Sequence, residues 1–236
     1  MVMGSLRTDG ITTYMKQGRV IVRSANSMQK RSNTLPQFIQ RQKMRHSVAL
    51  WRLLKYCEPM FTEGTTAYNN FLSLANRLPA VYVEKTVMEK TSFLMPGIPV
   101  SDGKLTEISQ ELGEVDGMPA LITGLVGKDW DYRAKLWLFT AVQTGSDRDI
   151  CVKFSKRELA WEEMALVDGR YVLKGEEFGD DMKGWALVLV KGERCSPQTI
   201  VTRCTFYKKY MTEEALEKAI DSYGGLTDSW NYRMLR

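Results

Sequence analysis

The chain has 236 residues, of which 44% are hydrophobic and 26% charged, and its net charge is +5. This length supports a full hydrophobic core, in one large domain or two small ones, and the composition is that of a globular domain rather than of a disordered chain. No apolar run approaches the roughly 18 residues that a membrane-spanning helix needs, and residues 1–10 lack the apolar centre of a secretory signal. We therefore expect a cytoplasmic protein with no membrane partner.

The charge is concentrated at one end of the chain. Residues 1–56 hold eleven Lys or Arg and one acid, Asp9, so this segment carries +10 and residues 57–236 carry −5. No acid occurs between Gly10 and Cys57, whereas an ordinary solvated helix mixes charges of both signs. A one-signed basic segment predicts contact with a polyanion or with an acidic protein surface.

The first predicted element is a β-hairpin formed by residues 11–16 and 19–24, in which Gly18 supplies the positive φ of a tight turn. Alternation along the second strand places two valines on one face and two arginines on the other: Val20 and Val22 against Arg19 and Arg23. An isolated hairpin is only marginally stable in water, so this one needs a surface to lie against. The polar residues 24–33, which include Lys30 and Arg31, are expected to form a connector.

A helix is predicted from Thr34, a good N-cap, to about Tyr56, with Pro36 in its first turn. At 100° per residue, one broad arc of this helix is apolar: Ile39, Met44, Leu50, Trp51, Leu54 and Cys57. Four cations fall within roughly 80° of each other on the opposite side: Arg41, Arg45, Arg52 and Lys55. Lys43 lies near the apolar arc, and His46 lies at the border between the two arcs.

A second helix is predicted over residues 65–77, ended by Pro79, so that residues 34–79 form a helical hairpin. The chain after residue 80 changes to short strands and turns. Strands are predicted at 81–84, 121–126, 136–142, 150–154, 171–173, 185–190 and 200–207. Residues 211–223 predict a closing helix capped by Thr212.

This series of short strands favours a β-sandwich of the immunoglobulin or fibronectin kind, although the Cys-Trp-Cys framework of true immunoglobulin domains is absent. The expected fold class is therefore α+β. A basic β-hairpin and helical hairpin occupy residues 1–79, and a β-sandwich-like domain with a closing C-terminal helix occupies residues 80–236.

Several motifs occur together along most of the chain. They are the run Pro96-Gly-Ile-Pro-Val-Ser-Asp-Gly-Lys-Leu105, the segment from Lys183-Gly-Trp185 to Arg194-Cys-Ser-Pro-Gln198, the tail Gly225-Leu-Thr-Asp228, and the helix opening with Arg31, Thr34 and Gln37. In these motifs, and in its basic start and strand-rich C-terminal half, the chain resembles a domain family of gut bacteria to which no activity is assigned. The resemblance implies a shared fold and carries no functional residues.

No catalytic signature stands out. The nearest approach to a phosphate loop, residues 97–104, has five residues between its glycines and a leucine after its lysine, so a plain turn is a better interpretation than a Walker loop. His46, the only histidine, is interpreted as a boundary side chain, and the alternative is a cation that adds to the basic face at lower pH. The acidic loop 176–181 lacks the ligand spacing of an EF-hand. We expect no enzymatic activity and no cofactor.

The four cysteines lie far apart, and a single histidine argues against a Cys/His zinc site, so no metal is expected. We interpret the thiols as reduced and mostly buried. A disulfide between Cys195 and Cys204, across neighbouring strands, remains the alternative.

Two functions without catalysis are left open. In the first, eight cations bind a polyanion, nucleic acid in particular, without reading its sequence: Arg19, Arg23, Lys30, Arg31, Arg41, Arg45, Arg52 and Lys55. In the second, the chain is a structural or assembly protein, such as a virion or surface-array component, and the hairpin is the arm through which it forms homo-oligomers. An acidic protein surface is a third kind of partner for the same cations, and Trp130 and Trp230 are the tryptophans most suited to contact a partner.

Overall fold

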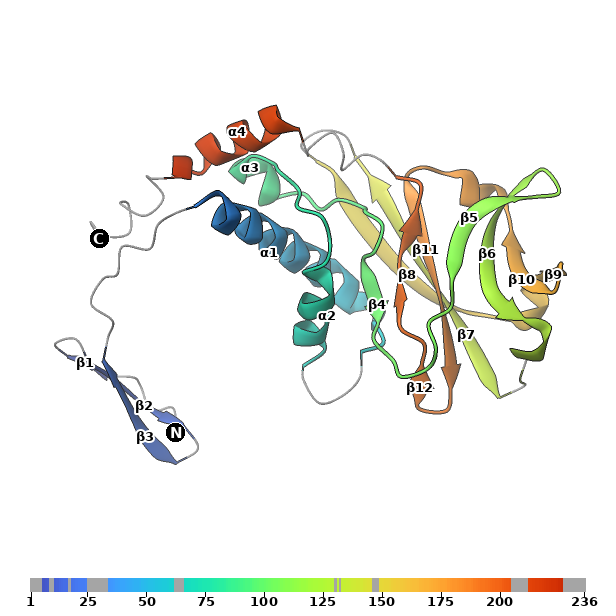
Figure 1. Ribbon diagram of the computed structural model, residues 1–236, viewed down its shortest axis with the longest axis horizontal. Coiled ribbons are helices and arrows are strands. Elements are labelled where there is room, and N and C mark those ends of the chain that lie inside the picture. The colour runs from blue at the N-terminus through green and yellow to red at the C-terminus, as the bar shows by residue number, and fades with distance from the viewer. Residues whose placement is uncertain are drawn as a thin grey trace.

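The computed structural model describes residues 6–8, 11–16, 18–24, 34–61, 66–129, 131, 133–145, 149–204 and 212–226. Within these residues the chain is an α+β protein of helices and antiparallel sheets (Figure 1). The helices are α1 (Leu35–Leu54), α2 (Ala67–Ala75), α3 (Lys85–Met88) and α4 (Glu213–Ser222). None of the described helices combines the length and the apolar character needed to cross a membrane.

A five-stranded sheet lies at the centre of the fold, and most of its residues belong to three long strands. Its main path runs β12-β11-β7-β8, and β14 pairs with the other end of β11. The strands are β7 (Ala134–Thr144), β8 (Cys151–Leu159), β11 (Lys183–Lys191), β12 (Arg194–Cys195) and β14 (Val201–Thr202). Two short strands, β4 (Pro99–Ser101) and β13 (Gln198–Thr199), pair beside it.

Both faces of the five-stranded sheet are buried, and β11 shows this directly. Trp185, Leu187 and Leu189 pack on one side, whereas Ala186 and Val188 pack on the other. This is the alternation of a strand covered on both faces. It explains why the continuous apolar run 185–190 occupies the centre of the sheet, as the sequence predicts.

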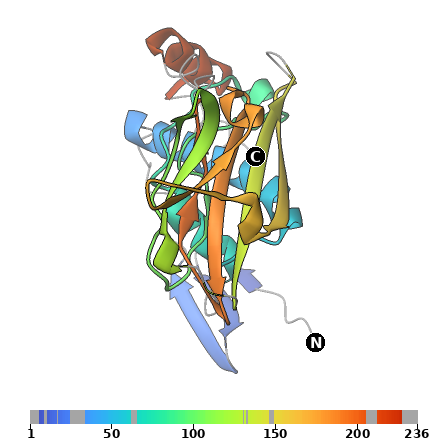
Figure 2. The ribbon, with the colours of Figure 1, turned by 90° about the vertical axis from the view of Figure 1, so that its right-hand side faces the viewer.

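A four-stranded sheet covers one face of the five-stranded sheet. Its order is β5-β6-β10-β9, with β5 (Gln110–Val115), β6 (Met118–Val126), β9 (Ala165–Val167) and β10 (Arg170–Lys174). Leu121 and Leu173 of this sheet share a core with Leu136 and Leu187 of the other, and we call this the sheet-side core. Figure 2 shows the four-stranded sheet from the outside.

The helices cover the opposite face of the five-stranded sheet (Figure 1). Leu50 and Leu54 of α1 and Phe71 of α2 pack with Phe139 and Val188 of the sheet, in what we call the helix-side core. The fold therefore has three layers: helices, five-stranded sheet and four-stranded sheet. At the edge of the helical layer, α4 lies beside α3, where Lys218 pairs with Glu84 and the Ser222 hydroxyl accepts from the Lys85 backbone N–H.

The start of α1 follows the predicted capping pattern. The Gln37 Oε1 accepts a hydrogen bond of 3.4 Å from the backbone N–H of Thr34, and Pro36 lies in the first turn. This reciprocal cap satisfies a donor that the helix itself cannot pair. The second predicted helix is confirmed as α2, although it is shorter than residues 65–77.

Three predictions on the body of the chain are wrong or incomplete. Residues 81–84 form no strand: Val81 and Val83 are buried against the helix-side core, but their backbone leads into α3 instead of pairing in a sheet. The strand expected over 200–207 is reduced to β14, and residues 205–207 lie outside the described residues. Met44, placed on the apolar arc of α1, is instead 38% exposed.

The N-terminal segment forms its own small sheet. Its strands are β1 (Leu6–Thr8), β2 (Ile11–Lys16) and β3 (Arg19–Ser24), and β2 pairs antiparallel with β3 from Ile11 opposite Ser24 to Lys16 opposite Arg19. Within the described residues, these three strands pair with no strand of the other sheets.

Candidate functional site

The four cations predicted on one side of α1 define the α1 basic face: Arg41, Arg45, Arg52 and Lys55. The buried side chains of α1 lie on the rest of its circumference, at Phe38, Gln42, His46, Ser47, Leu50 and Leu54. Arg45, Arg52 and Lys55 are exposed and Arg41 is half-buried. With a rise of 1.5 Å per residue, the face extends over about 21 Å of helix.

Arg45 has an aromatic partner in the closing helix. Its guanidinium carbon lies 4.3 Å from the centroid of the Tyr223 ring, just after α4, and the same ring meets Phe38 edge-on. Burial raises the pKa of Tyr223, Arg45 opposes this rise, and Glu89 adds to it. Arg45 is therefore held by a cation–π contact in the neighbourhood of one carboxylate, and it offers less free charge than Arg52.

Arg52 and Lys55 extend the basic face toward the C-terminal end of α1. Lys55 Nζ lies 4.9 Å from the centroid of the exposed Tyr56 ring. The ion pairs found among the described residues all lie elsewhere and use neither Arg45, Arg52 nor Lys55. The three exposed cations of this helix face therefore have no ion pair among the described residues.

Lys43, which fitted neither arc of the helix, caps the neighbouring helix. Its Nζ donates a 2.6 Å hydrogen bond to the backbone carbonyl of Asn76, at the C-terminal end of α2, and Gln40 Nε2 donates to the Asn76 side chain. A cation at a helix C-terminus satisfies a free carbonyl and complements the helix dipole. Lys43 therefore belongs to the structure of the helical hairpin rather than to the basic face.

His46 is not at a boundary, contrary to the sequence interpretation. It is 1% exposed, and its Nε2 accepts a 3.2 Å hydrogen bond from the backbone N–H of Phe93. Burial lowers its pKa to about 4, and Nε2 can accept the Phe93 N–H only while it carries no proton. A neutral, enclosed imidazole adds no charge to the basic face at moderately acidic pH, so the alternative of a pH-dependent cation is also wrong.

The other predicted cations lie before α1. Arg19 is exposed at the start of β3, opposite Lys16, and Arg23 lies in the same strand opposite Thr12. Lys30, Arg31, Trp130 and Trp230 lie outside the described residues. The structure therefore brings together the four helix cations, and it places Arg19 and Arg23 in a separate sheet.

The residues considered for metal or redox chemistry do not form a site. None of the four cysteines is in a disulfide, so the alternative pairing of Cys195 with Cys204 is wrong. Burial raises the pKa of the Cys57 and Cys195 thiols, which makes them less reactive. In the acidic loop, Asp180 pairs with Lys183, and the described residues contain no group of three or more His, Cys, Asp or Glu that could hold a metal ion.

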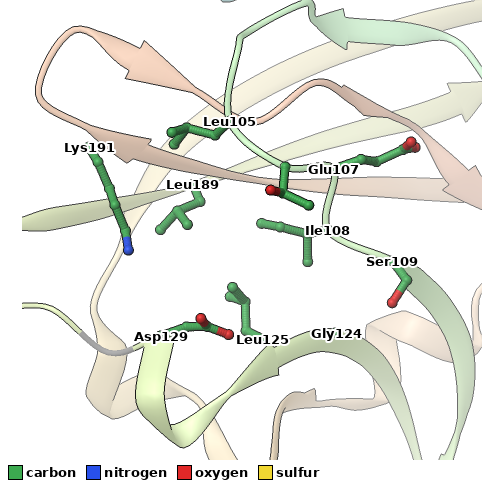
Figure 3. Close-up of a pocket in the computed structure, with 10 residues that line it drawn as sticks. Leu105, Glu107, Ile108, Ser109, Gly124, Leu125, Asp129, Leu189 and Lys191 are labelled. Carbon is green, nitrogen blue, oxygen red and sulfur yellow. The ribbon is translucent and has the colours of Figure 1, made fainter.

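One cavity of about 400 Å³ opens between the two sheets (Figure 3). Leu105, Ile108, Leu125 and Leu189 supply its apolar wall, and its polar groups are Glu107, Ser109, Asp129 and Lys191. Asp129 is already engaged, because its Oδ2 accepts from the Val126 backbone N–H. The lining also includes Thr106, and its described residues contain no histidine or cysteine.

A second charged region was missed at the sequence level. The four-stranded sheet and its flanking segments, residues 105–129 and 160–181, hold twelve acids and three bases, a net charge of −9. We call this region the acidic sheet. The sequence reveals the acidic sheet when the net charge is counted segment by segment rather than over the whole of residues 57–236.

No protein-family model matches the chain, and comparisons with curated proteins and with solved structures find no match. Membership of the gut-bacterial family therefore stays a prediction.

Proposed function

We propose that this protein is a non-catalytic binding protein and that the α1 basic face contacts a polyanion, nucleic acid in particular. The carrying observation is that Arg45, Arg52 and Lys55 are exposed on one helix face and have no ion pair with the described carboxylates. Cations that converge on one side without bound counter-charges release condensed ions from a phosphate backbone when they bind it.

The spacing of these cations suits a backbone rather than a single phosphate group. The basic face is about 21 Å long, whereas duplex DNA presents phosphates every 3.4 Å or so along each strand. Arg45 is steered by Tyr223 and Lys55 by Tyr56, so both are partly ordered before binding. Contacts of this kind position a protein on nucleic acid and carry no sequence information.

We infer that the two sheets form a sandwich of the immunoglobulin or fibronectin kind, which carries the helices as a rigid body. The strand order supports this inference. Taking β5 to β12 in chain order as strands A, B, C, C′, D, E, F and G turns the two sheets into A-B-E-D and G-F-C-C′. Immunoglobulin domains distribute their strands between two sheets in this way.

Salt dependence of binding to a short DNA duplex tests the proposal. If four phosphates are engaged, the slope of log K against log salt is roughly −4 between about 50 and 200 mM salt. Arg52→Gln, which removes one exposed cation, should reduce the slope by about 1. Arg194→Gln removes an exposed cation on β12 and is the matched control, with an unchanged slope expected. A flat salt dependence, or equal effects of the two variants, contradicts the proposal.

The N-terminal sheet favours assembly as a second candidate function. Val20 and Val22 are 66% and 63% exposed, and Met15, opposite Val20, is 43% exposed. A small sheet that leaves these three apolar side chains in water is suited to be covered by another chain. Sedimentation of the full chain tests this candidate, since an assembly protein forms oligomers whose mass rises with concentration, and a mass that stays at one chain contradicts it. A nucleic-acid-binding protein belongs in the cytoplasm, and an assembly protein in a virion or surface array.

A further inference from the structure

We propose that the apolar face of the N-terminal sheet in one copy of this chain docks on the acidic sheet of a second copy, in a head-to-tail arrangement. The inference rests on assembly, the second candidate function, and names the surface that receives the arm.

The docking face of the arm is defined by strand register. Met15 and Val20 are directly opposite each other, as are Thr13 and Val22, so these four side chains share one face. Arg19 lies on the other face by alternation. The arm thus presents exposed apolar groups on one face and Arg19 on the other, and its residues 6–24 hold four cations and one acid, a net charge of +3.

The acidic sheet has the complementary charge, and most of it is not neutralised. Of its twelve acids, three form ion pairs: Asp116 with Lys174, Glu163 with Arg157, and Asp180 with Lys183. The remaining nine have no ion pair with the described cations, and they are Glu107, Glu111, Glu114, Asp129, Glu162, Asp168, Glu176, Glu177 and Asp181. An arm of +3 and a region of −9 attract each other between copies.

The outward face of the acidic sheet also offers apolar groups. Leu112 and Leu121 point into the sheet-side core, so their neighbours Glu111 and Ile122, which are opposite each other, point outward. Val115 and Met118 form another outward pair, and Met118 is 41% exposed. The helices lie on the far side of the five-stranded sheet and leave this face uncovered by a helical layer (Figures 1 and 2). Apolar groups beside free carboxylates match an arm of valines and cations.

The arm and the acidic sheet lie on opposite sides of the fold, so a second copy is the partner that fits the acidic sheet. The arm leads into α1, which packs on the helix side of the five-stranded sheet, whereas the acidic sheet packs on its other side. Two different surfaces on opposite sides of one molecule form a heterologous contact, which builds rings or open chains rather than a closed symmetric dimer.

Mixing two variants of the full chain tests the arrangement. Val20→Glu with Val22→Glu disables the arm, and Glu111→Lys with Met118→Lys, both on the outward face, disables the acidic sheet. At low salt the wild type should sediment as multiples of 27.0 kDa, and each double variant alone as a single chain, with self-association weakened by about tenfold or more. An equimolar mixture should form a two-chain species and stop there, because it contains one intact arm and one intact acidic sheet. Met44→Glu, at a 38% exposed position of α1 outside both surfaces, is the control and should assemble as the wild type does.

Each other outcome overturns the inference. If the Glu111→Lys, Met118→Lys chain still assembles, the arm binds something other than the acidic sheet, and the assembly function stands without this surface. If the mixture stays at one chain, the two surfaces are not complementary. If the wild type is a single chain at low salt, the assembly function itself fails, while duplex binding by the α1 basic face is measured separately and is unaffected.

Discussion

The two sides of the five-stranded sheet are packed by different means. On the sheet side, Leu136, Leu187 and Trp185 meet Leu121 and Leu173 in a core of large apolar side chains. On the helix side, apolar residues are joined by buried polar groups that bond to backbone, among them His46 to Phe93 and Gln143 to Leu94. The sheet side also contains hydrogen bonds of this kind, because the Gln110 side chain of β5 both donates to and accepts from the Leu187 backbone of β11. The helix side differs in that it also depends on the protonation state of one imidazole.

The exposed surfaces of the two sides also differ, in the sign of their charge. The helix side carries the α1 basic face, and the sheet side carries the acidic sheet. The rigid five-stranded sheet between them keeps opposite charges apart on one chain. Changes on either side should therefore have distinct signatures, in packing on the sheet side and in pH dependence on the helix side.

The largest effect is expected from the sheet-side core. Trp185→Ala removes a side chain that is 1% exposed and packs on Phe178, and should cost about 3–5 kcal/mol in the free energy of unfolding. Leu166→Ala, at a 57% exposed position of β9, is the control and should change stability by no more than about 0.5 kcal/mol. Urea unfolding at neutral pH measures both. Equal costs would show that the sheets do not depend on this core.

Acid should destabilise the helix side through His46. The unfolded chain takes up a proton near the ordinary pKa of 6.5, whereas the folded chain takes it up only near 4. The unfolded state therefore binds more protons between these values, so stability falls as pH falls from 6.5 to 4, by about 3 kcal/mol in total. Urea unfolding at a series of pH values measures this slope.

His46→Gln provides the comparison, because its amide oxygen can still accept from the Phe93 N–H but does not titrate. This variant should lose the slope between pH 6.5 and 4. Two carboxyls also titrate differently in the folded chain: backbone N–H groups, of Ala160 and Met182 respectively, lower the pKa values of Glu163 and Asp180. Their protonation reduces stability only at pH values below their ordinary pKa values of 4.5 and 3.8. The same slope in wild type and variant would contradict the assignment to His46.

The sequence predicts the elements whose own residues determine them. The cap at Thr34 and the apolar period locate α1, short apolar or alternating runs locate β6, β7, β8 and β10, and a continuous apolar run locates β11. β5 was missed because Gln110–Val115 contains two glutamates and a glycine, which have low strand propensity, and pairing with β6 stabilises it. The signal for it was the turn: Asp116 and Gly117 both have positive φ, as a two-residue hairpin of this kind requires.

The candidate site was predicted in part for the same reason. Helical spacing alone places Arg41, Arg45, Arg52 and Lys55 on one face, because it depends only on local geometry. The burial of His46 depends on a segment 47 residues further along the chain, and the contact of Arg45 with Tyr223 on a segment far beyond it. Helical periodicity holds no information on such distant partners.

A smaller effect on the helix side is expected from Gln143. Its Oε1 accepts a 2.8 Å hydrogen bond from the buried backbone N–H of Leu94. Gln143→Met keeps the length of the side chain but leaves this donor unpaired, which should cost about 1–3 kcal/mol. Thr144→Val, at the exposed neighbouring position of β7, is the control. A cost as small as that of the control would show that water reaches Leu94.

The smallest effect tests the link between the first two helices. Lys43→Met keeps an unbranched side chain beside α2 but removes the bond to the Asn76 carbonyl and the charge at the end of that helix. The expected cost is about 0.5–1.5 kcal/mol. Because Lys43 lies off the basic face, duplex binding and its salt slope should not change. A fall in the slope by about 1, as predicted for Arg52→Gln, would instead place Lys43 among the residues that contact phosphate and extend the basic face around α1.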